Sequence, residues 1–176
     1  MTAESTLRDL YDRHWVGLVR LAGLLLGSTD AAEEVVQDAY VAIFRRIDRF
    51  ADAGDAYGYL RTSVVNGCRS VHRHRAVVHR TPVLADVAPA LPDEIAVRHE
   101  ADEHVMTALR TLPPRQQEVL VLRYYADASE AEIADTLGIS RGAVKSHAHR
   151  GMNALRGLLV GTSDRSDPAG GRPARG

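Results

Sequence analysis

The sequence of 176 residues has one cysteine, one lysine, few aromatic residues and no long apolar run. Cys68 has no partner for an intrachain disulfide, and a single thiol excludes a cysteine-rich zinc site. The longest uncharged apolar stretch, residues 21–27, is far shorter than the roughly 20 residues that a membrane span needs. No basic segment followed by an apolar run marks a secretory signal. We therefore expect a soluble cytoplasmic protein with no membrane insertion.

The average composition hides a segregation of charge along the chain. Apolar residues make up 45%, charged residues 26%, and the net charge is −1, which excludes a disordered chain or a wholly basic DNA-packaging protein. Residues 61–80 carry five arginines and no acid, and residues 141–156 carry four bases and no acid. Two such islands suit a chain that approaches polyphosphate at two places, although solvated helix faces are the commoner explanation of charge runs.

The stretch between the islands reads as a linker. Residues 81–104 contain six acids, one arginine and three prolines among small residues. Fully extended, this stretch could span roughly 80 Å, so the two halves of the chain need not touch. We predict domains over residues 1–80 and 105–160, with the linker between them and a disordered tail over residues 161–176.

Apolar spacing predicts an all-α fold, with two small helical domains and no convincing strand. A helix over residues 7–26 stops at Gly27, and Asp30 opens a second helix, pairs with Glu33 as in a capping box, and is followed by apolar positions until Gly54. A third helix covers about residues 56–75. Four more cover residues 96–112, 115–125, 130–137 and 141–160.

The last two helices have the spacing of a DNA-binding helix-turn-helix. Ser129 and Glu132 form a capping box, Gly138 supplies a left-handed turn and Ser140 caps the final helix. On that helix one stripe is apolar, while the opposite arc has hydrogen-bond donors, positive charge and no carboxylate. The arc consists of Gly142, Lys145, Ser146, His149, Arg150 and Asn153. It suits a major groove better than a merely solvated face.

The third helix also has two chemically distinct sides. The buried stripe is predicted to contain Tyr57, Leu60, Val64, Cys68 and Val71. The far side combines an aromatic ring, an amide and guanidinium groups, contributed by Tyr59, Thr62, Asn66, Arg69 and Arg73. Stacking, base-edge reading and backbone contacts by such groups are typical of single-strand binding, with a solvated amphipathic helix as the equal alternative.

The second helix carries apolar residues on its polar side. Val41 and Phe44 stand beside Gln37 and Asp38. Exposed apolar groups rimmed by charge indicate a partner surface, and the alternative is packing of Val41 and Phe44 against the first helix. The His72/His74 and His147/His149 pairs predict no metal site, because residues two apart point to different sides of a helix.

Four segments together resemble the extracytoplasmic-function (ECF) sigma factors, group 4 of the sigma-70 family of RNA polymerase sigma factors, in their actinobacterial form. The matching segments are residues 30–38, 57–66, 112–120 and 142–147 with Arg150. The resemblance covers roughly residues 5–159. It implies sigma region 2, a three-helix bundle, in the first domain and the helix-turn-helix of sigma region 4 in the second.

The resemblance implies a dissociable promoter-recognition subunit with no catalysis and no cofactor of its own. In the family, the second helix of region 2 docks on the beta-prime clamp helices of polymerase, which assigns that contact to Gln37, Asp38, Val41 and Phe44. The residues from Phe50 to Asp55 correspond to a loop that, with Asn66, captures a flipped base of the minus-ten element. Tyr59 stands where many members have tryptophan.

Region 4 of the family reads the minus-thirty-five duplex. The corresponding residues here are Arg141, Lys145, Ser146, His149 and Arg150, while Arg115 is expected to touch the DNA backbone or the beta flap of polymerase. An anti-sigma factor is a further expected partner. We expect weak affinity of the free chain for DNA, because base flipping costs a few kcal/mol that docking on polymerase must help to meet.

Two rival interpretations remain at this stage. Residues 114–120 and 144–147 also resemble the helix-turn-helix output domain of response regulators, but residues 1–80 lack the parallel-strand runs of a receiver domain. A protein-binding helical adaptor is the rival from another class. Transcription with core polymerase discriminates, because an adaptor gives no promoter-specific start.

Overall fold

The computed structural model describes residues 3–78 and 99–163, and within these ranges the chain is helical and has no strand. The predicted linker up to residue 98 and the predicted tail from residue 164 onward lie outside the described residues. The prediction that the tail begins at residue 161 is wrong, because the last helix extends to Ser163. No helix in the described ranges combines the length and apolar character that crossing a bilayer demands. The fold class predicted from sequence, an all-α chain with two helical domains, is confirmed.

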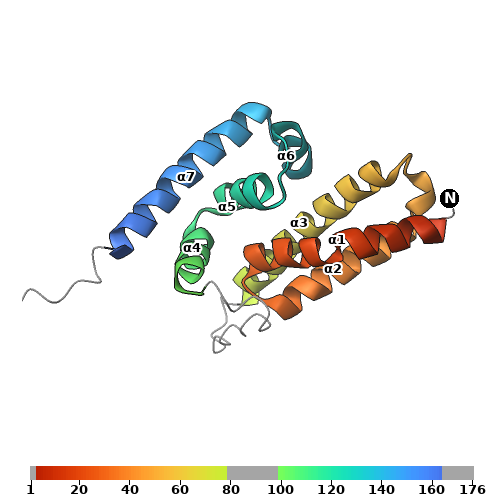
Figure 1. Ribbon diagram of the computed structural model, residues 1–176, viewed down its shortest axis with the longest axis horizontal. Helices are drawn as coiled ribbons and strands as arrows, with labels where there is room; N and C mark the ends of the chain where they lie inside the picture. The colour runs from red at the N-terminus through yellow and green to blue at the C-terminus, as the bar shows by residue number, and fades with distance from the viewer. Residues whose placement is uncertain (1–2, 79–98, 164–176) are drawn as a thin grey trace, which may run out of the picture.

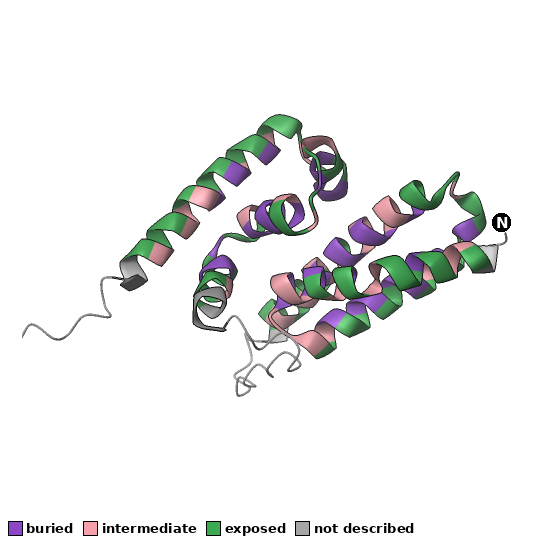
Figure 2. Ribbon diagram, in the orientation of Figure 1, coloured by how far each residue is buried: buried purple, intermediate pink, exposed green. Residues whose placement is uncertain are grey.

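The first domain is a three-helix bundle. It consists of α1 (Ala3–Leu26), α2 (Thr29–Phe44), the short 3-10 helix η1 (Ile47–Arg49) and α3 (Ala53–Val78). The three long helices pack pairwise against one another (Figure 1). Their inward stripes are buried, with Leu18, Val36, Ile43, Leu60 and Val64 almost fully enclosed (Figure 2). Apolar burial of this kind holds the bundle together.

The ends of the first two helices agree with the sequence prediction in part. Gly27 has φ +69°, as its expected role at the end of α1 requires. The prediction that Asp30 opens α2 is wrong: the cap is Ser28, whose Oγ accepts from the N–H of Ala31 at 3.4 Å. The prediction that the apolar helix extends to Gly54 is also wrong. The backbone tightens at Arg46, whose N–H donates to the Ile43 carbonyl three residues back, and α2 ends at Phe44.

The third helix begins earlier than predicted. Asp52 accepts from the N–H of Asp55 at 2.9 Å, and this side-chain cap satisfies a free backbone donor at the start of α3. Midway along α3, Gly67 permits close approach to α2, because a Cβ there would lie 2.6 Å from Cγ1 of Val35. The register of α3 on the bundle therefore depends on a residue without a side chain.

The second domain contains α4 (His99–Thr111), α5 (Pro114–Leu120), the π-helical turn η3 (Val121–Tyr125), α6 (Glu130–Leu137) and α7 (Arg141–Ser163). Because α4 begins at His99, residues 99–104 are helical, although charge and composition assigned them to the linker. Helix α7 packs against α4, α5 and α6. Val119, Leu122, Ile133 and Val144 form the centre of this core.

The predicted helix-turn-helix is present between α6 and α7. The capping box is complete: Ser129 Oγ accepts from the Glu132 N–H, and the Ser129 N–H donates to the Glu132 carboxylate at 2.9 Å. Gly138 has φ +64°, and Ser140 Oγ accepts from the Ala143 N–H at 3.1 Å. Each of these local predictions is confirmed, because each depends on residues close in sequence.

The two domains lie in contact, although the length of the linker did not require it. Helix α6 packs on α3, η3 packs on α1, and α4 touches α1 near its end (Figure 1). At that end the Arg110 guanidinium lies against Gly27, where a Cβ would come within 3.1 Å of Nε. The helices of the second domain thus cover part of the α3 surface.

Candidate nucleic-acid and partner surfaces

The side of α7 that faces away from the core presents all six residues of the predicted polar arc, four of which were predicted to contact duplex DNA. We call Gly142, Lys145, Ser146, His149, Arg150 and Asn153 the α7 arc, and every member is exposed. Val144 and Ala148 on the opposite side are buried in the second domain. The helix is therefore oriented by its apolar stripe so that the donors point outward.

Short-range hydrogen bonds organise the α7 arc. Arg150 donates to Ser146 Oγ at 3.0 Å, and the side chains of Asn153 and His149 lie within 3.0 Å, each pair one helical turn apart. The helix carries no carboxylate in this arc, as predicted, but Glu130 of α6 lies 3.6 Å from Lys145 Nζ. The neighbouring helix thus places one acid where the sequence of α7 alone has none.

The other two predicted upstream contacts lie at the edges of the helix-turn-helix. Arg141, in the first turn of α7, is exposed. Arg115, in the first turn of α5, donates to Glu118 Oε2 at 3.2 Å and to the Leu137 carbonyl at 3.4 Å. Arg115 is thus engaged by its own domain rather than grouped with the α7 arc.

Of the residues predicted to bind a single strand, Phe50 follows η1 and the others are on α3, where their environments differ. We call Tyr59, Thr62, Asn66, Arg69 and Arg73 the α3 face. Tyr59 is half-buried, its ring packs 5.2 Å from that of Phe50, and its hydroxyl accepts from Arg46 at 3.3 Å. Asp55 is exposed in the first turn of α3, so the prediction that the whole segment from Phe50 to Asp55 is a loop is wrong from Ala53 onward. Helix α3 already begins at Ala53 because the Asp52 side chain caps its first turn.

Arg69 makes a two-pronged ion pair with the second domain. Its Nε and Nη2 donate to the two carboxylate oxygens of Glu118 at 2.7 and 2.8 Å, while Nη1 donates to Asn66 Oδ1 at 3.2 Å. Parallel hydrogen bonds to both oxygens are the strongest arrangement of this pair. Arg73 is exposed and donates to Ser70. The α3 face is thus occupied at Arg69 and open at Asn66 and Arg73.

Arg61 forms a second ion pair between the domains. Only 4% of this residue is exposed, and its two terminal nitrogens each lie 3.3 Å from Glu132 Oε1. Its Nε is buried with no partner, and its guanidinium lies 5.6 Å from the centre of the Tyr57 ring. The hydrogen bonds from Ser129 lower the pKa of Glu132, and the Arg61 guanidinium lowers it further. The charged form of the carboxylate therefore serves both the cap of α6 and the contact between the domains.

The other side of Tyr57 is covered by His14 of α1. The two rings stack with centroids 4.1 Å apart. Burial lowers the pKa of His14, and the charge of Arg13 adds to this effect. The lowered pKa favours the neutral imidazole of His14 near neutral pH.

The residues of α2 that were predicted to contact a partner lie on the outside of the bundle. We call Gln37, Asp38, Val41 and Phe44 the α2 patch, and all four are exposed, with Val41 at 52% and Phe44 at 61%. The alternative that Val41 and Phe44 pack against α1 is wrong. Large apolar groups left at this exposure beside polar ones are typical of an interface that is completed by another protein.

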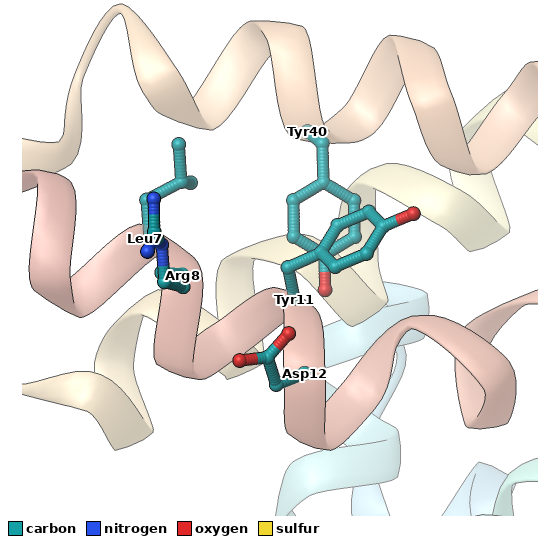
Figure 3. A pocket seen from close by; sticks show the side chains of 5 residues that line it. All are labelled: Leu7, Arg8, Tyr11, Asp12 and Tyr40. Carbon is teal, nitrogen blue, oxygen red and sulfur yellow. The ribbon is translucent and has the colours of Figure 1, made fainter.

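A hollow between α1 and α2 is lined by none of the predicted site residues. Leu7, Arg8, Tyr11, Asp12 and Tyr40 line it (Figure 3). The hydroxyl of Tyr40 donates to the Leu10 carbonyl at 2.9 Å, and burial raises the pKa of Tyr40. The Tyr40 hydroxyl therefore locks α2 to α1, and nothing in the hollow is arranged for chemistry.

The structure reveals three functional candidates that sequence reasoning missed: Arg61, Gln117 and Glu118. Gln117 and Glu118 are each only 6% exposed, and Gln117 Nε2 donates to the Leu24 carbonyl in the first domain at 3.1 Å. A signal existed, because Glu118 is the lone acid between residues 112 and 125 and stands at the start of an apolar run. Its partner, 49 positions away, could not be read from the sequence.

The described residues contain no cluster of three or more metal-ligating side chains. Cys68, predicted as a small core residue, is free and only 2% exposed. Burial raises the pKa of its thiol to about 12, and the nearby Glu118 carboxylate contributes to the same shift. The thiol is therefore an inert filler beneath the contact between the domains.

Comparison with known families matches both domains. Residues 10–77 match sigma-70 region 2, and residues 108–157 match sigma-70 region 4. The first match covers the three-helix bundle with the α2 patch and the α3 face. The second covers the helix-turn-helix and the α7 arc.

Several curated proteins are similar over most of the chain. The ECF RNA polymerase sigma factor SigL of Mycobacterium tuberculosis is 34% identical over 160 residues, which is 88% of this chain and 89% of that protein. The RNA polymerase sigma-E factor of Streptomyces coelicolor is 33% identical over 144 residues, covering 81% of this chain and 80% of that protein. Both are actinobacterial, in agreement with the resemblance identified from the motifs.

Two solved structures share the fold. The sigma factor RpoE of Bartonella quintana, in complex with the anti-sigma factor NepR, has a TM-score of 0.72 and 25% identity, over 87% of this chain and 98% of that one. CnrH, in complex with the cytosolic domain of CnrY, has a TM-score of 0.62 and 23% identity, over 94% and 96% of the two chains. The second likeness bears on the fold alone.

Proposed function

The chain belongs to the sigma-70 family as an RNA polymerase sigma factor of the extracytoplasmic-function type, and we propose a division of promoter recognition among its three exposed surfaces. The α2 patch docks on polymerase, the α3 face holds the opened minus-ten strand, and the α7 arc reads the minus-thirty-five duplex. The polymerase supplies the chemistry of RNA synthesis, and the chain has no catalysis of its own. It acts in the cytoplasm, where promoter DNA is found.

The role of the α7 arc is supported by its donors and their exposure. Lys145 and Arg150 can donate to guanine edges or to phosphates, and Ser146 can bond to either. The free amides at the start of α7 add partial positive charge near Arg141. Breaking the ion pair of Lys145 with Glu130 on DNA binding costs little free energy, because the contact is long and largely accessible to solvent.

The role of the α3 face is supported by an aromatic pair next to an amide. The rings of Phe50 and Tyr59 contact each other at a tilt near the start of α3, and Asn66 is exposed two turns further along. Rings hold unstacked bases, and an amide reads a base edge once the base has left the duplex. Thr62, Arg69, Arg73 and Asp55 complete the proposed strand-binding surface around them.

The role of the α2 patch is supported by the exposure of Phe44 and Val41. An apolar pair beside Gln37 and Asp38 offers a compact anchor for a helical partner such as the beta-prime clamp helices. Arg115 lies in the first turn of α5, and a contact of this residue with DNA backbone or the beta flap is proposed. The complex of the Bartonella relative with NepR supports an anti-sigma factor as a further partner.

The observation that carries this proposal is the coexistence of an exposed α7 arc and an exposed α2 patch on separate domains. Neither an adaptor nor a response-regulator output domain requires both. Mapping of RNA 5′ ends made by core polymerase with and without the chain tests it. New starts that share two sequence elements at constant spacing are expected. An unchanged set of starts contradicts the proposal.

A further inference from the structure

The contact between the domains occupies Arg69, a residue that the proposed function assigns to the minus-ten strand. Glu118 engages Arg69 through both carboxylate oxygens, and only 8% of the Glu118 side chain and 21% of the Arg69 side chain are exposed. A phosphate group would approach the same guanidinium edge with the same two-pronged geometry. A carboxylate of the second domain therefore stands where a phosphate of the strand would bind.

Other contacts hold the second domain in this position. Arg61 pairs with Glu132 beneath α6, and Gln117 donates to the Leu24 carbonyl near the end of α1. These contacts lie on either side of the Arg69–Glu118 pair along the interface. The second domain is thus fixed over α3 at several points, and one broken contact does not by itself separate the domains.

We propose that the free chain is autoinhibited: Glu118 takes the place of a strand phosphate on Arg69, so that the second domain and single-stranded DNA compete for the α3 face. This inference rests on the proposed function, because it concerns the same strand-binding residues. Only molecules whose domains have separated bind the strand, so the apparent affinity is reduced by the fraction that is open. The expected weak DNA binding of the free chain then has a structural cause.

The closed arrangement leaves the other two surfaces accessible. Helix α2 packs on α1 and α3, whereas the second domain contacts α1 and α3, and the α2 patch stays exposed (Figures 1 and 2). The α7 arc is exposed as well. Polymerase can therefore dock on the closed chain first, and the strand-binding surface is uncovered afterwards. This order prevents capture of unrelated single-stranded nucleic acid before docking.

Substitution of Glu118 tests the competition directly. Glu118→Gln keeps the shape of the side chain and removes the charge that holds Arg69. We expect the free full-length chain to bind a fluorescent single-stranded oligonucleotide of random sequence roughly ten-fold more tightly, measured by anisotropy, because the open fraction rises. Asp135→Asn is the matched control, since it removes an exposed acid from the same domain with the same change in net charge.

Two further variants separate opening from a general charge effect. Arg69→Ala added to Glu118→Gln is expected to abolish the gain, because the released guanidinium is what the strand binds. Gln117→Ala removes a contact between the domains without changing the charge, and roughly two-fold tighter binding is expected from partial opening. If circular dichroism shows that Glu118→Gln does not fold, Gln117→Ala becomes the test. The inference is then overturned if Gln117→Ala binds the oligonucleotide no more tightly than the unmodified chain does.

A gain in Glu118→Gln no larger than that in Asp135→Asn overturns autoinhibition. The result is distinguishable from failure of the proposed function, which transcription with core polymerase tests separately. A chain that directs promoter-specific starts while Glu118→Gln behaves like its control remains a sigma factor without a closed inhibitory state. A chain that directs no starts while Glu118→Gln binds the strand more tightly has the closed state and a different role.

Discussion

The basic helices α3 and α7 carry similar residues in opposite surroundings. On α3, Arg61 and Arg69 each face a carboxylate supplied by the other domain, and Arg61 is almost fully buried. On α7, Arg150 bonds only within its own helix, and Lys145 has a single distant acid while 68% of its side chain stays exposed. One basic surface is closed, and the other is open.

The difference teaches that local charge does not determine whether an arginine is available to DNA. Residues 61–80 and 141–156 are equally free of acids in sequence. The acids that occupy α3 come from α5 and α6 through the packing of the domains. An exposed ion pair contributes about 0–1 kcal/mol and yields to a competing phosphate, whereas a shielded two-pronged pair resists one.

The largest expected effect tests whether the α2 patch docks on core polymerase. Phe44→Asp places a charge at the centre of the α2 patch, and we expect association with core polymerase to weaken about 100-fold, as for a central interface anchor. Surface plasmon resonance with immobilised core enzyme measures this. Val16→Asp, at another exposed valine, is the control. Equal binding of both variants would remove the docking role of the patch.

A substitution on the open surface is expected to act on duplex recognition alone. Arg150→Ala removes a donor of the α7 arc, and occupancy of the upstream promoter element by the holoenzyme should fall about ten-fold. Footprinting of that element is the measurement. Arg13→Ala, an exposed arginine of α1 that pairs with Asp9, should leave the footprint unchanged. An intact footprint with Arg150→Ala would mean that the arc faces away from DNA.

A substitution at the exposed Asn66 of the α3 face is expected to act on opening alone. Asn66→Ala should leave the upstream footprint intact and reduce strand opening by the holoenzyme about five-fold, the effect of one lost base contact. Permanganate reactivity of unpaired thymines reports opening. Wild-type reactivity would refute base capture by Asn66, and the comparison of α3 with α7 would then lose its functional meaning.

The smallest effect concerns the thiol beneath the closed surface. Folding raises the pKa of Cys68 from 9.0 to about 12, because the buried site favours the neutral thiol. The contribution of this thiol to the free energy of unfolding is therefore fully present below pH 9 and is lost as the pH rises from 9 to 12. Between pH 8.5 and 10 the free energy of unfolding should fall by about 1 kcal/mol more in the wild type than in Cys68→Ala. Urea titrations at both pH values measure this, and parallel falls would contradict it.

Sequence reasoning reached the features that depend on neighbours along the chain. The capping box of Ser129 and Glu132, the positive φ of Gly138 and the exposed arc of α7 follow from spacing, because helix periodicity and caps are local. Helix periodicity placed Val41 and Phe44 on the polar side of α2, and their exposure in the structure decides between the two interpretations that the sequence left open. The all-α fold and the helix-turn-helix were accessible for the same reason.

What could not be predicted depends on residues distant in sequence or on competing local caps. The end of α2 at Phe44 required knowledge of the Asp52 cap and of the tightened turn at Arg46. The pairing of Arg69 with Glu118 joins residues from separate domains, and the length of the linker left their distance open. Only the tertiary structure reveals that one basic surface is covered.

The distance between the domains tests most directly whether the α3 face is closed until polymerase binds. In a Cys68→Ala background, fluorophores at Arg13→Cys on α1 and Gly157→Cys on α7 report that distance by energy transfer, since both positions are exposed. We predict a single high-transfer state in the free chain and a shift to low transfer when core polymerase is added. Equal transfer in both states, with binding of polymerase verified, would contradict the account.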